Sequence, residues 1–248
     1  MRKVKKILIS QPDPSEKSPY SDLVEKYNVK IDFRPFLQVE SVSLKDFRKQ
    51  KIEILSHTAI IFTARTAVDH FFHICEGLRI NIPETMKYFC MSETIALYLQ
   101  KYIVYRKRKI FFGNGSLVSL LELTKTSKHK VEKFLLVLAD SFKPEVPKIF
   151  EKAKLKVTRA ILYRTIASDL SDLDLSEYDL IALFSPREIK SLQQNFPNFE
   201  QGDILFAAFG PATVKAIKAA KYSLSVEVPK QGIQSMSKAL DIFLKANS

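Results

Sequence analysis

The regular alternation of short apolar runs with amphipathic stretches is the feature that most constrains the fold of this chain. Stretches whose apolar residues have helical spacing lie between nearly all of the short runs. Strands that alternate with helices in this way build βα units, so the sequence predicts an α/β fold with mostly parallel sheets. The predicted strands span residues 5–10, 29–36, 58–64, 87–92, 109–114, 133–140, 156–165, 179–185, 204–210 and 222–228.

The length and composition of the chain are those of a globular protein. Its 248 residues suit one large or two modest domains, and 46% hydrophobic residues suffice for a core. No apolar stretch approaches the ~20 residues of a membrane span, and the apolar segment near the N-terminus is too short for a signal peptide. We therefore expect a soluble, cytoplasmic monomer in which Cys75 and Cys90 are buried thiols.

The charge of the chain points to an anionic partner. The formal net charge is +12, and the most concentrated basic run is YRKRK at residues 105–109. The other basic residues are scattered over the polar faces of predicted helices, and there is no zinc-finger pattern or aromatic platform for single strands. These features favour a small polyanion over nucleic acid or a membrane.

The few glycines exclude the common phosphate-binding motifs and draw attention to another segment. With six glycines the chain has neither GxGxxG nor GxxxxGK[ST]. Residues 206–220, FAAFGPATVKAIKAA, instead predict a buried strand, a turn at Gly210 and Pro211, and a helix that carries Thr213. The unpaired amide groups of such a helix start can bind an anion.

An internal repeat predicts two similar α/β domains. Residues 58–72 and 179–196 both read as a strand, a hydroxyl-bearing loop and a helix, and each is followed by a second unit of the same kind. Strand-like segments flank the first copy on both sides. We therefore expect one domain from residues 1–37 and 166–248 and another from 38–165, with crossings near 34–42 and 160–168 that form a double hinge.

Five short motifs follow one another along the chain in a characteristic order. They are ILISQP from Ile7, FTARTAV from Phe62, YRT from Tyr163, FSP from Phe184 and FAAFGPATVKAI from Phe206. In this order they resemble the uroporphyrinogen-III synthase family, and the resemblance covers essentially the whole chain. The last segment is the most specific, since it is similar to the family pattern A-x-G-x-x-T-A-x-A-L.

The resemblance implies a fold and a reaction. It implies two flavodoxin-like parallel-sheet domains joined by a two-stranded linker, with the active site in the cleft between them. The implied enzyme is a lyase of porphyrin and heme biosynthesis that cyclises hydroxymethylbilane, a linear tetrapyrrole with eight carboxylates, to uroporphyrinogen III. Ring D is inverted through a spiro intermediate without a metal or an organic cofactor. Transient contact with hydroxymethylbilane synthase is a further expectation.

The resemblance also implies site residues. Tyr163 is the candidate catalytic residue, as a general acid toward the departing hydroxyl, although the residue alone reads as an ordinary strand tyrosine. Hydroxyls after predicted strands at Thr63, Ser185 and Thr213 are also expected to cap helices. The implied substrate contacts are Gln11, Thr63, Ala64, Arg65, Ser92, Ser185, Pro186, Gly210, Pro211 and Thr213.

Some residues depart from the family pattern and leave alternatives open. Gln11 stands where bacterial relatives usually carry arginine, and Ser92 and Ile95 replace the glycine and threonine of a G-x-x-T pattern. His70 and His73 could form a metal pair, but no third ligand has suitable spacing. The alternatives are a non-catalytic two-domain protein that binds an anionic small molecule, and a nucleic-acid-associated protein that uses YRKRK.

Overall fold

The computed structural model describes residues 3–14 and 18–247 of the chain. It divides into two compact units: the first unit is Met1–Gln38 with Ile166–Ser248, and the second unit is Val39–Thr165. The boundaries lie within β3 (Leu37–Ser41) and β8 (Val157–Ala167). Both units have the α/β architecture that the alternation of strands and helices predicts, each with its own sheet.

The first unit contains a five-stranded sheet in the order β11-β10-β9-β1-β2, with parallel pairing throughout. Numbered by their order within this unit, the strands run 2-1-3-4-5, which is the flavodoxin-like order of doubly wound sheets. Its strands and helices are β1 (Lys6–Ile9), α1 (Ser21–Tyr27), β2 (Lys30–Phe33), η3 (Leu175–Glu177), β9 (Leu180–Leu183), α7 (Pro186–Asn195), β10 (Leu205–Phe209), α8 (Pro211–Ala219), β11 (Val226–Val228) and α9 (Met236–Ala246).

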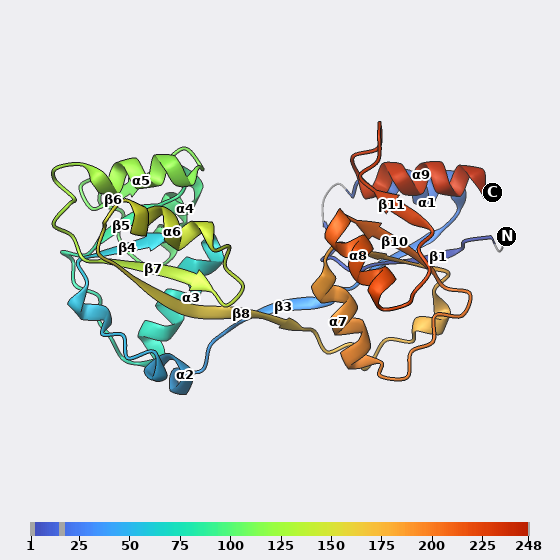
Figure 1. Cartoon of the computed structure of the whole chain (residues 1–248), viewed down its shortest axis with the longest axis horizontal. Helices are drawn as coiled ribbons and strands as arrows, with labels where there is room; N and C mark the ends of the chain where they lie inside the picture. Colours follow the sequence, from blue (N-terminus) through green and yellow to red (C-terminus); the bar gives the residue numbers. More distant parts are fainter. Residues whose placement is uncertain (1–2, 15–17, 248) are drawn as a thin grey trace. The chain divides into compact units, whose positions relative to one another are not determined.

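Helices cover both faces of this first sheet. Alternate strand residues point to opposite sides, so Ile7 packs in a cluster with residues of α1 and α9, whereas Leu8 packs with α7 and α8. Figure 1 shows α1 and α9 on one face of the sheet and α7 and α8 on the other. Burial on both faces explains why the strands read as continuous apolar runs in the sequence.

The second unit contains a six-stranded sheet in the order β3-β8-β7-β4-β5-β6. The pairs from β8 to β6 are parallel, and helices α2, α3 and α4 cover one face while α5 and α6 cover the other. Its remaining elements are α2 (Leu44–Lys49), η1 (Ile54–Ser56), β4 (Ala59–Phe62), α3 (Arg65–Gly77), β5 (Lys87–Cys90), α4 (Glu93–Tyr98), η2 (Leu99–Lys101), β6 (Ile110–Phe112), α5 (Leu117–Lys125), β7 (Phe134–Ala139) and α6 (Glu145–Lys152).

The strand predicted at residues 29–36 ends three residues early. β2 ends at Phe33 and β3 begins only at Leu37, with Pro35 in the gap. Proline has no amide hydrogen and cannot continue a strand ladder. After the break, Phe36 is fully buried, and its carbonyl accepts hydrogen bonds from the Ser191 hydroxyl and the Ser168 amide.

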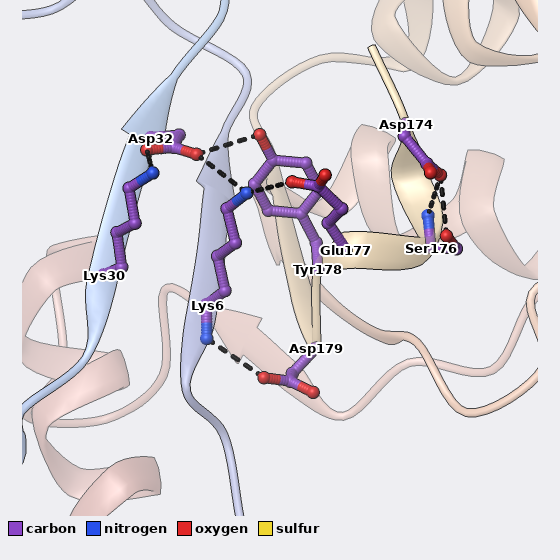
Figure 2. Close-up of polar contacts among 8 residues, drawn as sticks. All are labelled: Lys6, Lys30, Asp32, Asp174, Ser176, Glu177, Tyr178 and Asp179. Carbon is purple, nitrogen blue, oxygen red and sulfur yellow. Dashed lines mark hydrogen bonds and ion pairs between the residues drawn. The ribbon is translucent and has the colours of Figure 1, made fainter.

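A charged network joins β1 and β2 to the segment that leads into β9 (Figure 2). The Tyr178 hydroxyl donates to Asp32 Oδ2 at 3.0 Å, and the Lys6 ammonium lies 4.5 Å from the centre of the Tyr178 ring. Lys6 also pairs with Glu177 and with Asp32. Burial raises the pKa of Tyr178 to about 12, with the hydrogen bond to Asp32 adding to the effect. This phenol therefore has a structural partner.

The structure also bears on the cysteines and the histidine pair. Cys75 and Cys90 are buried free thiols, as predicted, and burial raises the pKa of each to about 12. Across residues 3–14 and 18–247, no three His, Cys, Asp or Glu side chains gather as a metal site would require. Within the same residues, no helix has the length and apolar character needed to cross a membrane.

Candidate functional site

Parallel α/β sheets bind ligands at the carboxyl ends of their strands, beside the point where the strand order reverses. In the first unit that point lies between β1 and β9, so it is bordered by Gln11 and by the loop at Ser185. In the second unit it lies between β4 and β7, so it is bordered by Thr63. The predicted site residues therefore fall into two groups, one at the carboxyl edge of each sheet.

A buried glutamate occupies the β9–α7 loop of the first unit. Ser185 is the N-cap of α7, Pro186 is its first residue, and Glu188 in the first turn is only 6% exposed. Glu188 Oε2 accepts hydrogen bonds from the Phe184 amide and the Ser10 hydroxyl, each at 2.6 Å, and from the Ser185 amide at 3.4 Å. The protein's own carboxyl group thus accepts the hydrogen bonds of the two amides that lead into this helix.

Burial raises the pKa of Glu188, and its hydrogen bonds from Phe184 and Ser10 oppose that effect only in part. Glu188 is not among the residues predicted from the sequence. A readable signal was present, since Ser185 and Glu188 have the S-x-x-E spacing of a capping box. The side chain joins the end of β1 to the start of α7, and it therefore fixes this corner of the first unit.

The β10–α8 segment has the predicted strand, turn and helix. Gly210 has a φ of 89°, a conformation that favours glycine, and its amide donates to the Val228 carbonyl at 2.6 Å. Pro211 is the first residue of α8, where the missing amide hydrogen costs nothing. Thr213 is 1% exposed, so a ligand reaches its side chain only if the loop moves.

The prediction that hydroxyls cap these helices is confirmed in position at one residue and is wrong at two. Ser185 is the N-cap of α7, whereas the N-caps of α3 and α8 are Ala64 and Gly210. Thr63 precedes its helix by two residues and Thr213 lies in the first turn. The reason is that each of these loops begins its helix at a residue with extended or positive-φ backbone, and a hydroxyl side chain is not required for that conformation.

The β4–α3 loop of the second unit corresponds to the β9–α7 loop of the first unit but has different side chains. Thr63 is half-buried, and the Ala64 side chain has no atom that could accept a hydrogen bond. Arg65 begins α3, is exposed, and places its guanidinium carbon 5.5 Å from the centre of the Tyr98 ring. Ala67 stands three residues after the N-cap, where α7 has Glu188. This helix start therefore lacks an internal carboxylate.

Ser92 borders a hollow at the ends of β5 and β6. It is the N-cap of α4, and its hydroxyl lies 2.8 Å from the Thr94 hydroxyl, while Ile95 is buried. The hollow has a volume of about 590 Å³ and is lined by Ser92, Glu93, Thr94, Phe112, Gly113, Asn114 and Ser119. Gln11, the other departure from the family pattern, is exposed two residues after the end of β1.

Tyr163 lies in β8 beside Ala139, the last residue of β7, and its carbonyl accepts a hydrogen bond from the Asp140 amide at 2.9 Å. The residue is 9% exposed, and burial raises the pKa of its phenol. The phenol therefore stays protonated at neutral pH. Its hydroxyl forms no hydrogen bond with any residue that the structure describes, so its donor is available to a ligand.

The Tyr163 ring stacks on His70 of α3, with ring centroids 5.1 Å apart and planes inclined by 14°. From the sequence, His70 is predicted only as half of a possible metal pair, because β8 and α3 lie far apart along the chain. Spacing within one helix carries no information about such a contact.

Comparison with known proteins identifies the family. A family model described as uroporphyrinogen-III synthase HemD matches residues 18–238. The chain belongs to the uroporphyrinogen-III synthase family. It is therefore an enzyme of tetrapyrrole biosynthesis, in the porphyrin and heme pathway, whose substrate is a small-molecule tetrapyrrole.

A solved synthase structure has the same fold. The uroporphyrinogen-III synthetase of Helicobacter pylori is 16% identical, with a TM-score of 0.55 and coverage of 98% of this chain and 99% of that one. A uroporphyrinogen III synthase of Thermus thermophilus is also 16% identical, with a TM-score of 0.43 and coverage of 98% and 100%. No curated protein sequence matches the chain.

Proposed function

We propose that this protein is a cyclising lyase that converts hydroxymethylbilane to uroporphyrinogen III with inversion of ring D. The family match over residues 18–238 is the observation that carries the proposal. The available phenol of Tyr163 and the polar strand ends of both sheets supply groups that suit the reaction. A net charge of +12 adds long-range attraction for a substrate with eight carboxylates.

The reaction has three steps. First, the terminal hydroxyl leaves as water, which makes the adjoining methylene carbon electron-poor. The substituted carbon of ring D then attacks that methylene carbon and forms a spiro intermediate. Finally, the bond from this ring carbon to its old bridge carbon breaks, the free carbon of ring D attacks the released bridge carbon, and a proton is lost. The pyrrole nitrogens supply the electrons for each step. The net change is the loss of one water.

We assign Tyr163 to the first step. Its phenol donates a hydrogen bond or a proton to the departing hydroxyl, a general-acid role open to a protonated phenol whose hydroxyl has no partner among the residues that the structure describes. Burial favours this role because it raises the pKa of Tyr163 and keeps the proton on the oxygen at neutral pH. The rest of the catalytic task is orientation, since the two ends of a flexible chain must meet.

The carboxylate arms of the substrate are proposed to bind at the strand ends. The amides and hydroxyls of helix starts attract carboxylates, and Arg65 adds an exposed cation. Because Glu188 already occupies the β9–α7 loop, we expect the second-unit residues to contribute more. The proposed contacts are Thr63, Ala64, Arg65 and Ser92 in the second unit, and Gln11, Ser185, Pro186, Gly210, Pro211 and Thr213 in the first.

A coupled assay tests the proposal. Porphobilinogen and hydroxymethylbilane synthase generate the linear tetrapyrrole, this protein is added, and the uroporphyrinogen isomers are separated. The proposal expects the type III isomer, and a transient contact between the two enzymes would favour transfer before spontaneous closure. If only the type I isomer forms while the tetrapyrrole still binds, the protein is a binding protein and not a synthase.

A further inference from the structure

A histidine, a tyrosine and a serine from three elements of the second unit pack together at the edge that carries Tyr163. His70 lies on α3, Tyr163 on β8 and Ser41 on β3. The imidazole and phenol rings are nearly parallel at a centroid distance of 5.1 Å, which is the geometry of an offset stack. This contact covers one face of the only phenol that we place in the reaction.

Ser41 holds the imidazole from its other end. The Ser41 hydroxyl and His70 Nδ1 share a hydrogen bond, so the plane of the imidazole is fixed by β3 as well as by its own helix. Burial lowers the pKa of His70, while neighbouring Asp69 opposes this effect. At neutral pH the stack therefore joins two uncharged rings.

The Tyr163 phenol needs such support. Its hydroxyl forms no hydrogen bond with the described residues, so no polar contact within them fixes the position of the phenol oxygen. Packing against the ring must do so, because the plane of the ring sets where its oxygen lies. Displacement of a catalytic group by about 1 Å can cost 10²-fold in rate, so the partner that fixes the ring plane has kinetic weight.

We propose that His70 is a positioning residue for Tyr163: its imidazole, clamped by Ser41, sets the plane of the phenol that acts on the substrate. This inference rests on the function proposed above. His70 itself touches neither the reacting atoms nor a metal in this assignment.

The chain offers a matched control on the same helix. His73 lies one turn beyond His70 and is exposed. The test compares His70→Ala, His70→Phe and Ser41→Ala with His73→Ala, each in the full chain and each repeated in a Tyr163→Phe background. Phenylalanine at position 70 keeps an aromatic ring for the stack and loses only the bond to Ser41.

We expect His70→Ala to lower kcat about tenfold with KM changed less than twofold, because the hydroxyl moves but the carboxylate contacts remain. His70→Phe should recover most of the loss, Ser41→Ala should show a smaller loss, and His73→Ala should behave as the parent. In the Tyr163→Phe background, His70→Ala should cost nothing further, since the group that it positions is gone.

A second measurement reads the same contact without catalysis. In protein labelled with ¹³C on its tyrosine rings, the Tyr163 signals are assigned by their loss in Tyr163→Phe. Removal of the imidazole face in His70→Ala should shift these signals, whereas His73→Ala should leave them unchanged. This readout also decides the matter if His70→Ala is too unstable for kinetics, since His70→Phe and Ser41→Ala can be compared in the same way.

The outcomes separate this inference from the function on which it rests. Parental kcat in His70→Ala, or a loss that simply adds to that of Tyr163→Phe, overturns the positioning role while synthase activity stands. Unshifted Tyr163 signals in His70→Ala also overturn it. Formation of only the type I isomer by the parent protein refutes the proposed function instead, and the inference falls with it.

Discussion

The two helix starts that repeat in the sequence, β9–α7 in the first unit and β4–α3 in the second, share a backbone plan and differ in one side chain. Three residues after the N-cap, α7 has Glu188 and α3 has Ala67. Glu188 binds the Phe184 and Ser185 amides of its own loop and the Ser10 hydroxyl. The second unit has a methyl group at the matching position.

This difference teaches that one loop geometry can serve stability in one place and ligand binding in another. A buried carboxylate that accepts hydrogen bonds from a helix start leaves little attraction for a second carboxylate, since like charges oppose each other. The loop without it keeps a positive end and has Arg65 beside it. We therefore expect changes at the second unit's edge to alter turnover, and changes at Glu188 to alter stability.

The largest expected effect separates two tyrosines. Tyr163→Phe should lower kcat on the order of 10²-fold, because it removes the proposed proton donor. Tyr178→Phe in the first unit is the matched control, since it removes a phenol hydroxyl that is bonded to Asp32 and takes no part in the proposed reaction. It should cost about 1 kcal/mol of stability and leave kcat unchanged. Similar kcat values for the two variants would break the comparison.

The next effect is on stability. Glu188→Ala should lower the free energy of unfolding by about 1–3 kcal/mol, because it leaves the buried Ser10 hydroxyl and Phe184 amide without an acceptor. Glu188→Gln keeps an acceptor oxygen and should lose much less. Urea denaturation of the two variants and the parent measures this. Equal midpoints for the parent and Glu188→Ala would show that the carboxylate does not hold the corner.

A pH series sharpens the same point. The pKa of Glu188 is raised above its usual value of 4.5, so the folded protein binds this proton more tightly than the unfolded chain does. Stability from this group is greatest below pH 4.5 and is lost as pH rises through the folded pKa. Relative to the parent, Glu188→Gln should gain stability as pH increases from 4.5 toward 8. A difference independent of pH would contradict the raised pKa.

The smallest effect concerns substrate affinity. Thr63→Val should raise KM about threefold, because one hydrogen bond from an uncharged hydroxyl to a solvent-exposed carboxylate arm is lost. Ser185→Ala, at the loop occupied by Glu188, should raise KM less. Initial rates at several substrate concentrations give both values. A larger effect at Ser185 than at Thr63 would reverse the assignment of the two loops.

The sequence predicts the fold well because the fold depends on local patterns. Buried strands appear as apolar runs, and Gly210 with Pro211 marks a turn whose backbone few other residues adopt. The break at Pro35 was readable from the missing amide hydrogen, but the apolar residues around it favoured one continuous strand. The N-caps at Ala64 and Gly210 were not readable, since their backbone conformations do not need a hydroxyl.

The candidate site is less predictable because its contacts join distant parts of the chain. Motif order leads to Tyr163, and the S-x-x-E spacing could have led to Glu188. The stack of His70 on Tyr163 and the bond to Ser41 depend on how α3, β8 and β3 pack in the second unit. The spacing of residues within one segment cannot predict how that segment packs against the others.

The position of β1 in the first sheet affects how the chain is synthesised. β1 is hydrogen-bonded to β2 on one side and to β9 on the other, and Ile7, Leu8 and Ile9 are fully buried between helices. On the ribosome, β9 emerges only after all of Val39–Thr165 has been translated. The nascent chain thus carries an apolar strand without its second neighbour through much of translation, and pairing of that open edge with another nascent chain is the misassembly that a cell must prevent.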